Sequence, residues 1–200
     1  MGAEHTCYDP TLGSGALQQG ELLANIWIPV ALYPPVEMPE GTDVEVDSID
    51  HPYMFVMTPD CDLEWDYNAR YPPEAQQNSA APEENESSHK FVPYVLLCDA
   101  FTRKEIRSRF PKNLWDRIQG NHDIRYHRFK AHQFEIEGAD PLEIPELYLD
   151  FKKINALPTK QFYEGVHSGG VQRIAVVTSP FNQNLVHRFF HFQSRVALPD

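Results

Sequence analysis

The sequence lacks long apolar runs and has few cysteines. No window of its 200 residues holds the ~18 uncharged apolar residues that a membrane span needs. The N-terminus has no basic segment followed by an apolar one, so no secretory signal is predicted. The three cysteines, Cys7, Cys61 and Cys98, are an odd number at unrelated spacings, which argues against a disulfide framework and for a reducing compartment. We therefore expect a cytoplasmic protein that has no membrane partner.

The composition is sufficient for one folded domain. Hydrophobic residues make up 42% of the chain and aromatic residues 12%, which is enough for a core and excludes a wholly disordered chain. Residues 1–14 are predicted to be a flexible tail, and residues 15–200 a single domain. Within that domain, residues 68–88 are rich in Pro, Ala, Asn, Glu and Ser and have almost no large apolar side chain. We predict a mobile acidic loop there, because such a segment cannot bury enough surface to offset its ordering entropy.

Charge is unevenly distributed along the chain. The formal net charge is −12, but residues 34–90 alone hold fourteen acidic residues against Arg70 and Lys90. Residues 101–130 have the opposite character, with nine lysines and arginines against three acidic residues. Such an asymmetry can steer charged partners to one end of a protein. The alternative is that both blocks are ordinary solvated surface.

Apolar runs and their periodicity predict an α+β fold. Six runs are predicted to be strands: residues 21–30, 53–57, 91–98, 125–130, 147–154 and 171–177. A capping box formed by Thr102 and Glu105 predicts one short helix, and Pro111 predicts the start of a second. A C-terminal helix is predicted from one apolar stripe: Phe181, Leu185, Phe189, Phe192 and Val196. This order indicates a small, strongly bent sheet or barrel with a helical insert and a C-terminal helix.

The segment "MTPDCDL", residues 57–63, places Cys61 between Asp60 and Asp62 after an apolar run. Three interpretations are open: a metal site, a nucleophilic cysteine, or a structural turn. Flanking carboxylates favour the neutral thiol over the thiolate that a nucleophile needs, and two aspartates are too few ligands for a hard cation. Aspartates at a strand exit hydrogen-bond nearby amides, so a structural turn with a buried Cys61 is favoured.

Two groups of histidines have metal-like spacings. His187 and His191, at i and i+4 of the predicted last helix, would share one face as in zinc-binding helices. That helix offers no third ligand, which favours two surface histidines. His122, His127 and His132 recur at an odd spacing, which puts neighbours on opposite faces of a strand. We therefore expect no bound metal and no cofactor.

The segment "FTRKEIRSRF", residues 101–110, begins a candidate binding site of basic and aromatic side chains. Its members are Arg103, Lys104, Arg107, Arg109 and Trp115. Basic residues interleaved with aromatic ones suit RNA or an acidic protein surface. They would also suit pairing with the chain's own acidic loop, and the sequence leaves these three partners open.

Three stretches resemble the first strands of the MazF/PemK-like toxin superfamily: "QQGELLANIWIP", "HPYMFVMTPDCDL" and "FVPYVLLCDAFT". The end of the chain, residues 173–199, is similar to the C-termini of bacterial proteins related to that barrel. The resemblance implies an SH3-like barrel, usually dimeric, that cuts single-stranded RNA without a metal. The family's catalytic arginine and hydroxyl fall on His51 and Thr102, so the arginine is absent from this sequence.

The missing arginine and the acidic surroundings of His51 weaken the case for RNA cleavage, because a guanidinium stabilises phosphorane charge at any pH. Our leading hypothesis is a regulatory, protein-binding module that has lost, or nearly lost, this activity. The resemblance suggests toxin–antitoxin, stress or phage-defence (antiviral) systems, with a basic partner such as a transcription (sigma) factor.

Two other functions remain as alternatives. One is a metal-independent endoribonuclease that uses His51 and Thr102. The other is a metal-dependent enzyme built on Asp60, Cys61, Asp62 and a histidine. We expect RNA binding to be weak, because acidic residues near His51 repel the phosphate backbone. A homodimer is one expected assembly.

Overall fold

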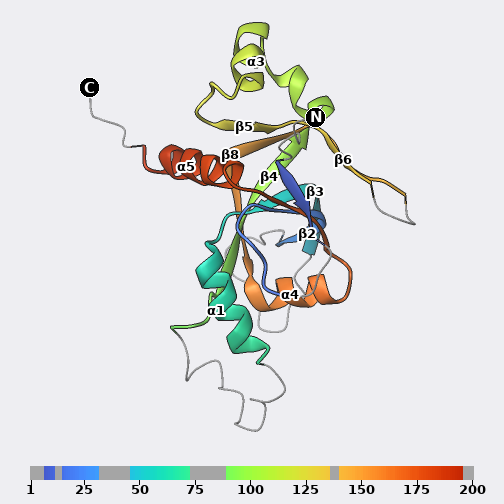
Figure 1. Cartoon of the computed structure of the whole chain (residues 1–200), viewed down its shortest axis with the longest axis vertical. Helices are drawn as coiled ribbons and strands as arrows, with labels where there is room; N and C mark the ends of the chain where they lie inside the picture. The colour runs from blue at the N-terminus through green and yellow to red at the C-terminus, as the bar shows by residue number, and fades with distance from the viewer. Residues whose placement is uncertain (1–6, 12–14, 32–45, 73–88, 136–139, 196–200) are drawn as a thin grey trace, which may run out of the picture.

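A curved antiparallel sheet with helices around it forms the body of the molecule (Figure 1). The computed structural model describes residues 7–11, 15–31, 46–72, 89–135 and 140–195. The strands are β1 (Tyr8–Pro10), β2 (Glu21–Ala31), β3 (Val46–Val56), β4 (Tyr94–Thr102), β5 (Tyr126–Phe129), β6 (His132–Phe134), β7 (Leu142–Ile144), β8 (Leu147–Pro158) and β9 (Gln172–Val177). The helices are α1 (Asp60–Arg70), α2 (Arg103–Ile106), the 3₁₀ turn η2 (Arg107–Arg109), α3 (Lys112–Gln119), α4 (Thr159–His167) and α5 (Phe181–Gln193).

The main sheet has the strand order β1-β9-β2-β3-β4-β8-β5, and β6 and β7 form a separate hairpin. Every pairing among the described strands is antiparallel. The predicted α+β class is therefore confirmed. Within the described ranges, no hydrogen-bonded pairing joins the edge strands β1 and β5.

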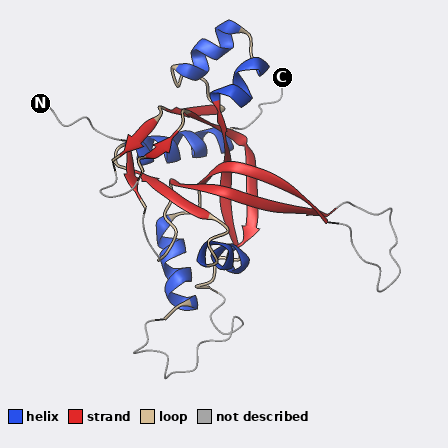
Figure 2. Cartoon of the chain, turned by 90° about the vertical axis from the view of Figure 1, so that its right-hand side faces the viewer, coloured by secondary structure: helices blue, strands red, loops and turns tan. Residues whose placement is uncertain are grey.

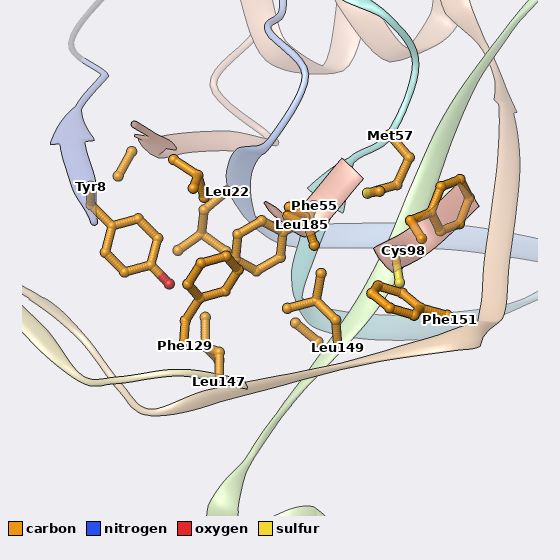
Figure 3. Close-up of a cluster of buried hydrophobic side chains, with 14 of the residues drawn as sticks. Tyr8, Leu22, Phe55, Met57, Cys98, Phe129, Leu147, Leu149, Phe151 and Leu185 are labelled. Atoms are coloured by element: carbon orange, nitrogen blue, oxygen red, sulfur yellow. The ribbon is translucent and has the colours of Figure 1, made fainter. Parts of the chain in front are cut away.

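Aromatic side chains bend this sheet around its main core (Figure 3). The ring of Phe55 on β3 stacks on Phe129 of β5, with centroids 5.4 Å apart. Tyr8 on β1 lies 5.4 Å from the same Phe129 ring. Because β1 and β5 are opposite edges of the sheet, these contacts require strong curvature. Side chains of the two edges meet across the core.

A second core lies on the other face of β3, because side chains alternate along a strand. Met54 and Val56 point there while Phe55 points to the main core. Helices α1 and α4 cover this second core with Leu63 and Phe162 respectively. Apolar residues thus line both faces of the central strands.

The C-terminal helix α5 packs on the main core as its sequence stripe predicts. Leu185, Phe189 and Phe192 are buried, and the Phe151 ring of β8 lies 5.7 Å from Phe189 and 6.0 Å from Phe192. Val196, the last member of the predicted stripe, lies outside the described residues.

Strands β2 and β3 are longer than predicted, and their far ends form a two-stranded ribbon (Figure 2). The described pairing with β9 stops at Ala24, and that with β4 starts at Tyr53. Beyond these points β2 and β3 pair with each other. Residues 46–50, which end an acidic segment, belong to β3. Pairing with the apolar strand β2 overrides their low strand propensity.

Two predictions made for the residues of helix α1 are wrong. Asp60, Cys61 and Asp62 form its first turn rather than a structural turn at the strand exit. The helix also continues into the start of the predicted mobile loop, to Arg70. Buried Asp66 explains this extension, because it accepts hydrogen bonds from the Arg70 side chain and the Val92 amide, both at 2.8 Å. Residues 73–88 of that loop, and residues 1–6 and 12–14 of the predicted tail, lie outside the described ranges.

Helix α4 was not predicted, although its buried Phe162 and Tyr163 pack on the second core. No helix in the described ranges is long and apolar enough to cross a membrane. Cys7, Cys61 and Cys98 are all free thiols, so no disulfide links these three residues.

Replacing Phe129 by alanine should destabilise the protein by about 3–5 kcal/mol, because the cavity would open where the two sheet edges meet. Chemical denaturation followed by tryptophan fluorescence measures this loss. Phe190→Ala is the matched control, since Phe190 is 52% exposed and should change stability by no more than about 0.5 kcal/mol. Equal losses in the two variants would contradict the role given to the Phe129 ring.

Candidate functional site

His51 lies where the β2–β3 ribbon leaves the sheet, and it contacts a buried carboxylate. Its Nδ1 is 3.0 Å from Oδ1 of Asp99, with exposed side-chain fractions of 14% and 8%. Oδ1 of Asp99 also accepts a hydrogen bond from the Asn155 side-chain amide at 2.8 Å. Asp99 occupies an irregularity of β4, where the register with β8 shifts between Cys98 and Ala100. Such a bulge re-aims a side chain, and here it points Asp99 at His51.

Burial and the neighbouring charges have opposite effects on the pKa of the Asp99 carboxyl. Burial raises the pKa of the Asp99 carboxyl, whereas the charges of His51 and Lys153 act to lower it. A carboxylate held in this way orients an imidazole ring. The His51–Asp99 pair therefore has the geometry of a general base with an orienting group.

Thr102, the second residue of the nuclease hypothesis, has a different environment. It pairs with Leu147 on β8, while His51 pairs with Ile26 on β2. Its hydroxyl donates to the Glu105 carboxylate at 2.7 Å, and its backbone amide donates to the same carboxylate at 2.7 Å. The predicted capping box is confirmed. The described interactions of Thr102 thus serve the start of α2 and do not involve His51.

Sequence reasoning did not find the partners of His51. Asp99 and Asn155 lie far from His51 in sequence, and strand register brings them together. One signal was available: Asp99 is a charged residue inside the apolar run "YVLLCDAF", and a buried charge needs a partner.

The helical insert α2–η2–α3, residues 103–119, forms what we call the basic lobe. The guanidinium groups of Arg103 and Arg107 lie over the Trp115 ring, at 5.8 and 5.3 Å from its centroid. Trp115 is only 3% exposed and packs on Tyr148 with centroids 4.9 Å apart. The tryptophan is therefore the core of the lobe and holds two of its cations in place.

The lobe continues onto the end of β4. The Arg109 guanidinium lies 5.2 Å from the Phe101 centroid, and Nζ of Lys153 lies 4.9 Å from it. Lys104 and Arg109 are exposed. The ion pair found for the lobe joins Arg103 to Glu146 at 3.9 Å. In the described part of the chain, no carboxylate lies within ion-pair distance of the other basic side chains of the lobe: Lys104, Arg107, Arg109, Lys112 and Arg117.

The acidic helix α1 lies at the opposite end of the molecule from the basic lobe (Figure 1). Its exposed carboxylates therefore do not neutralise the lobe. Cys61 on this helix is exposed, so the prediction of a buried thiol is wrong. The helix turns Leu63 and Asp66 inward, which leaves Cys61 on the solvent side, with its Sγ 3.6 Å from an Asp62 carboxylate oxygen.

The histidines do not converge. His187 and His191 are exposed neighbours on α5 with parallel rings, 6.4 Å apart. Of the other three, His122 is exposed, His127 is buried and His132 is half-buried. In the ranges that the structure describes, no three His, Cys, Asp or Glu side chains are grouped to hold a metal ion.

Comparison with protein-family models and with curated proteins found no match to this chain. The relationship to the MazF/PemK-like superfamily therefore stays a prediction from the sequence.

The buried His127 predicts a pH dependence of stability. Burial, together with the nearby charge of Arg188, lowers its pKa to about 3, against about 6.5 in an unfolded chain. The unfolded state therefore binds more protons between these values, and stability should fall as pH decreases from about 6.5 to about 3. The slope from this group is at most about 1.4 kcal/mol per pH unit. His127→Leu should flatten the denaturation midpoint plotted against pH, and His122→Leu should not.

Proposed function

We propose that the chain is a regulatory protein-binding module that holds an acidic segment of its partner on the basic lobe. The proposal rests on how the basic side chains of the lobe are positioned and on which of them lack a carboxylate partner. Arg103 and Arg107 are held in position by Trp115, and most of the lobe's basic side chains have no carboxylate partner among the described residues. Cations that the fold already holds in place, and that lack a carboxylate partner, are suited to bind carboxylates. Part of the entropy cost of ordering their side chains is met before the partner binds.

The aromatic contacts favour a protein partner over RNA. Single-stranded RNA is bound largely by stacking its bases on exposed aromatic rings. Trp115 is buried beneath two guanidinium groups, and Phe101 is flanked by Arg109 and Lys153. These rings are occupied by the lobe's own cations. The net charge of −12 adds a repulsion that grows with the length of a nucleic acid.

The biological setting of this proposal rests on the sequence resemblance. The strong bend of the sheet supports an SH3-like barrel of the MazF/PemK-like type. We propose a bacterial stress, toxin–antitoxin or phage-defence system as the setting, with the protein acting in the cytoplasm. The acidic helix α1 supports a second contact, with a basic partner such as a transcription factor. It carries exposed Asp60 and Glu64 at the end of the molecule away from the basic lobe.

Reversing two exposed charges of the lobe should weaken binding of an acidic peptide. We expect Lys104→Glu/Arg109→Glu to weaken binding of a fluorescein-labelled Asp/Glu-rich peptide by about tenfold or more, because each lost contact to a charged group is worth about 1.5 kcal/mol or more. Fluorescence anisotropy at low salt measures the affinity, which should fall as salt increases.

Lys90→Glu/Lys160→Glu is the matched control. Both lysines are exposed and lie outside the lobe, and the pair changes the net charge equally. If the control loses binding equally, the loss comes from the change in net charge and not from the lobe. If a single-stranded RNA of equal charge binds the wild type more tightly than the peptide, and only the lobe variant loses it, the partner is a nucleic acid.

RNA cleavage is a second candidate function, favoured by the His51–Asp99 contact. His51 could remove the proton of a 2′-hydroxyl, and the charge of Lys153 acts on its partner Asp99. Two observations weigh against it. The arginine of the resembled family is missing, and the Thr102 hydroxyl donates to Glu105.

We therefore expect no defined cuts when the protein is incubated with a long unstructured RNA at low salt in EDTA. Loss of one preorganised charge stabiliser costs about a hundred- to a thousandfold in rate, so any residual cleavage should be feeble. If the wild type cuts RNA and the cuts disappear in both His51→Ala and Asp99→Asn, the protein is an endoribonuclease. Cuts gained by His51→Arg alone would support a barrel whose catalytic arginine has been lost.

A further inference from the structure

A pocket of about 630 Å³ lies between β5, α5 and the end of α3. Its walls include Cys7, His127, Arg128, Lys130, Phe181 and Arg188. None of the described residues that line it is acidic. Neither the His51–Asp99 pair nor any basic side chain of the lobe lines this pocket, and Gln119 at the end of α3 is the residue of the lobe that does.

Arg128 is held rigidly at the edge of this pocket. Its Nε donates to Glu146 at 2.6 Å, and its Nη1 donates to the Gln119 carbonyl at 2.9 Å. The Asn121 side chain bonds both to the Arg128 amide, at 2.6 Å, and to its carbonyl, at 3.0 Å. This position is therefore built into the fold rather than sampled by a free surface side chain.

Arg188 is a half-buried cation whose Nε is buried. Its guanidinium donates to three backbone carbonyls, those of Asn121, Asp123 and Tyr126, and its buried Nε has no hydrogen-bond partner among the described residues. Burial lowers the pKa of Arg188, and the carboxylate of Asp123 partly offsets this effect. That carboxylate accepts the Arg125 amide at 2.9 Å. A partly buried charge without a directly bonded counter-ion is less well compensated than a paired one, and an anion in the pocket would improve its compensation.

His127 adds a second unsatisfied group beside Arg188. It is 4% exposed, and its Nδ1 is buried without a hydrogen-bond partner among the described residues. A buried polar atom without a partner costs free energy. The ring packs on Phe129 with centroids 4.7 Å apart, and Phe181 supplies a further apolar wall.

We propose that this pocket binds a small phosphomonoester that carries an aromatic or apolar group. The Arg188 guanidinium and the Lys130 ammonium suit a phosphate, and Arg128, which is ion-paired with Glu146, lies at the edge of the same pocket. The volume is within the range of about 300–1,000 Å³ of pockets that take organic ligands, and it is larger than inorganic phosphate requires. Phe181, which is half-buried, offers apolar surface for the ring of such a ligand.

The three free cysteines provide the test. Cys7 lines the pocket beside Lys130, Cys61 is exposed at the far end of the molecule, and Cys98 is buried. Alkylation with iodoacetamide, resolved by mass spectrometry of peptides, reports on each thiol. Adenosine monophosphate and phenyl phosphate should both slow the alkylation of Cys7 and leave Cys61 unchanged. Adenosine should not protect Cys7, and inorganic phosphate should protect it only weakly.

Lys130→Glu should reduce this protection by about tenfold or more in ligand concentration, whereas Lys160→Glu on α4 should not. Protection is compared with and without ligand within each variant, because the charge at residue 130 also affects the thiol. The proposal is overturned if neither phosphomonoester protects Cys7, if adenosine protects it equally, or if protection survives Lys130→Glu. Should Cys7 fail to react without ligand, the same variants and ligands are compared by isothermal titration calorimetry, with the same outcomes deciding.

Discussion

The packing of Phe55 and Tyr8 on Phe129 holds the main sheet in its curved form. It joins β3 and both edge strands, β1 and β5, around one ring. A flat sheet with this strand order would keep its two edges far apart. The bend required by the aromatic core carries β5 towards α5, and this approach creates the pocket between them.

The same bend separates the charges of the molecule. The basic lobe projects from the connection between β4 and β5, whereas α1 follows β3 on the opposite end (Figure 1). The two charged ends thus lie apart and do not neutralise each other. The lobe's aromatic residues serve the protein itself, since Trp115 is buried under Arg103 and Arg107. That arrangement favours recognition of carboxylates over the stacking of bases.

The His51–Asp99 pair depends on a local irregularity rather than on a motif. The register of β4 shifts next to Asp99, and Asn25 on β2, next to the partner of His51, has a positive φ of 60°. Both features lie where the ribbon leaves the sheet. They place His51, Asp99 and Asn155 together. Irregular backbone at such a junction is a common feature of sites that carry function.

Four features could be predicted from the amino-acid sequence: the α+β class, the capping box at Thr102, the strand around residues 126–129 and the apolar face of α5. These features are local, because a few neighbouring side chains decide them. Three other features could not be predicted in this way: Asp60 begins a helix, Cys61 is exposed, and His51 contacts Asp99 instead of Thr102. Each of these outcomes depends on residues distant in sequence, such as the Asp66–Val92 contact that holds α1. Strand register and buried partners are set by packing of the whole chain, which no local pattern encodes.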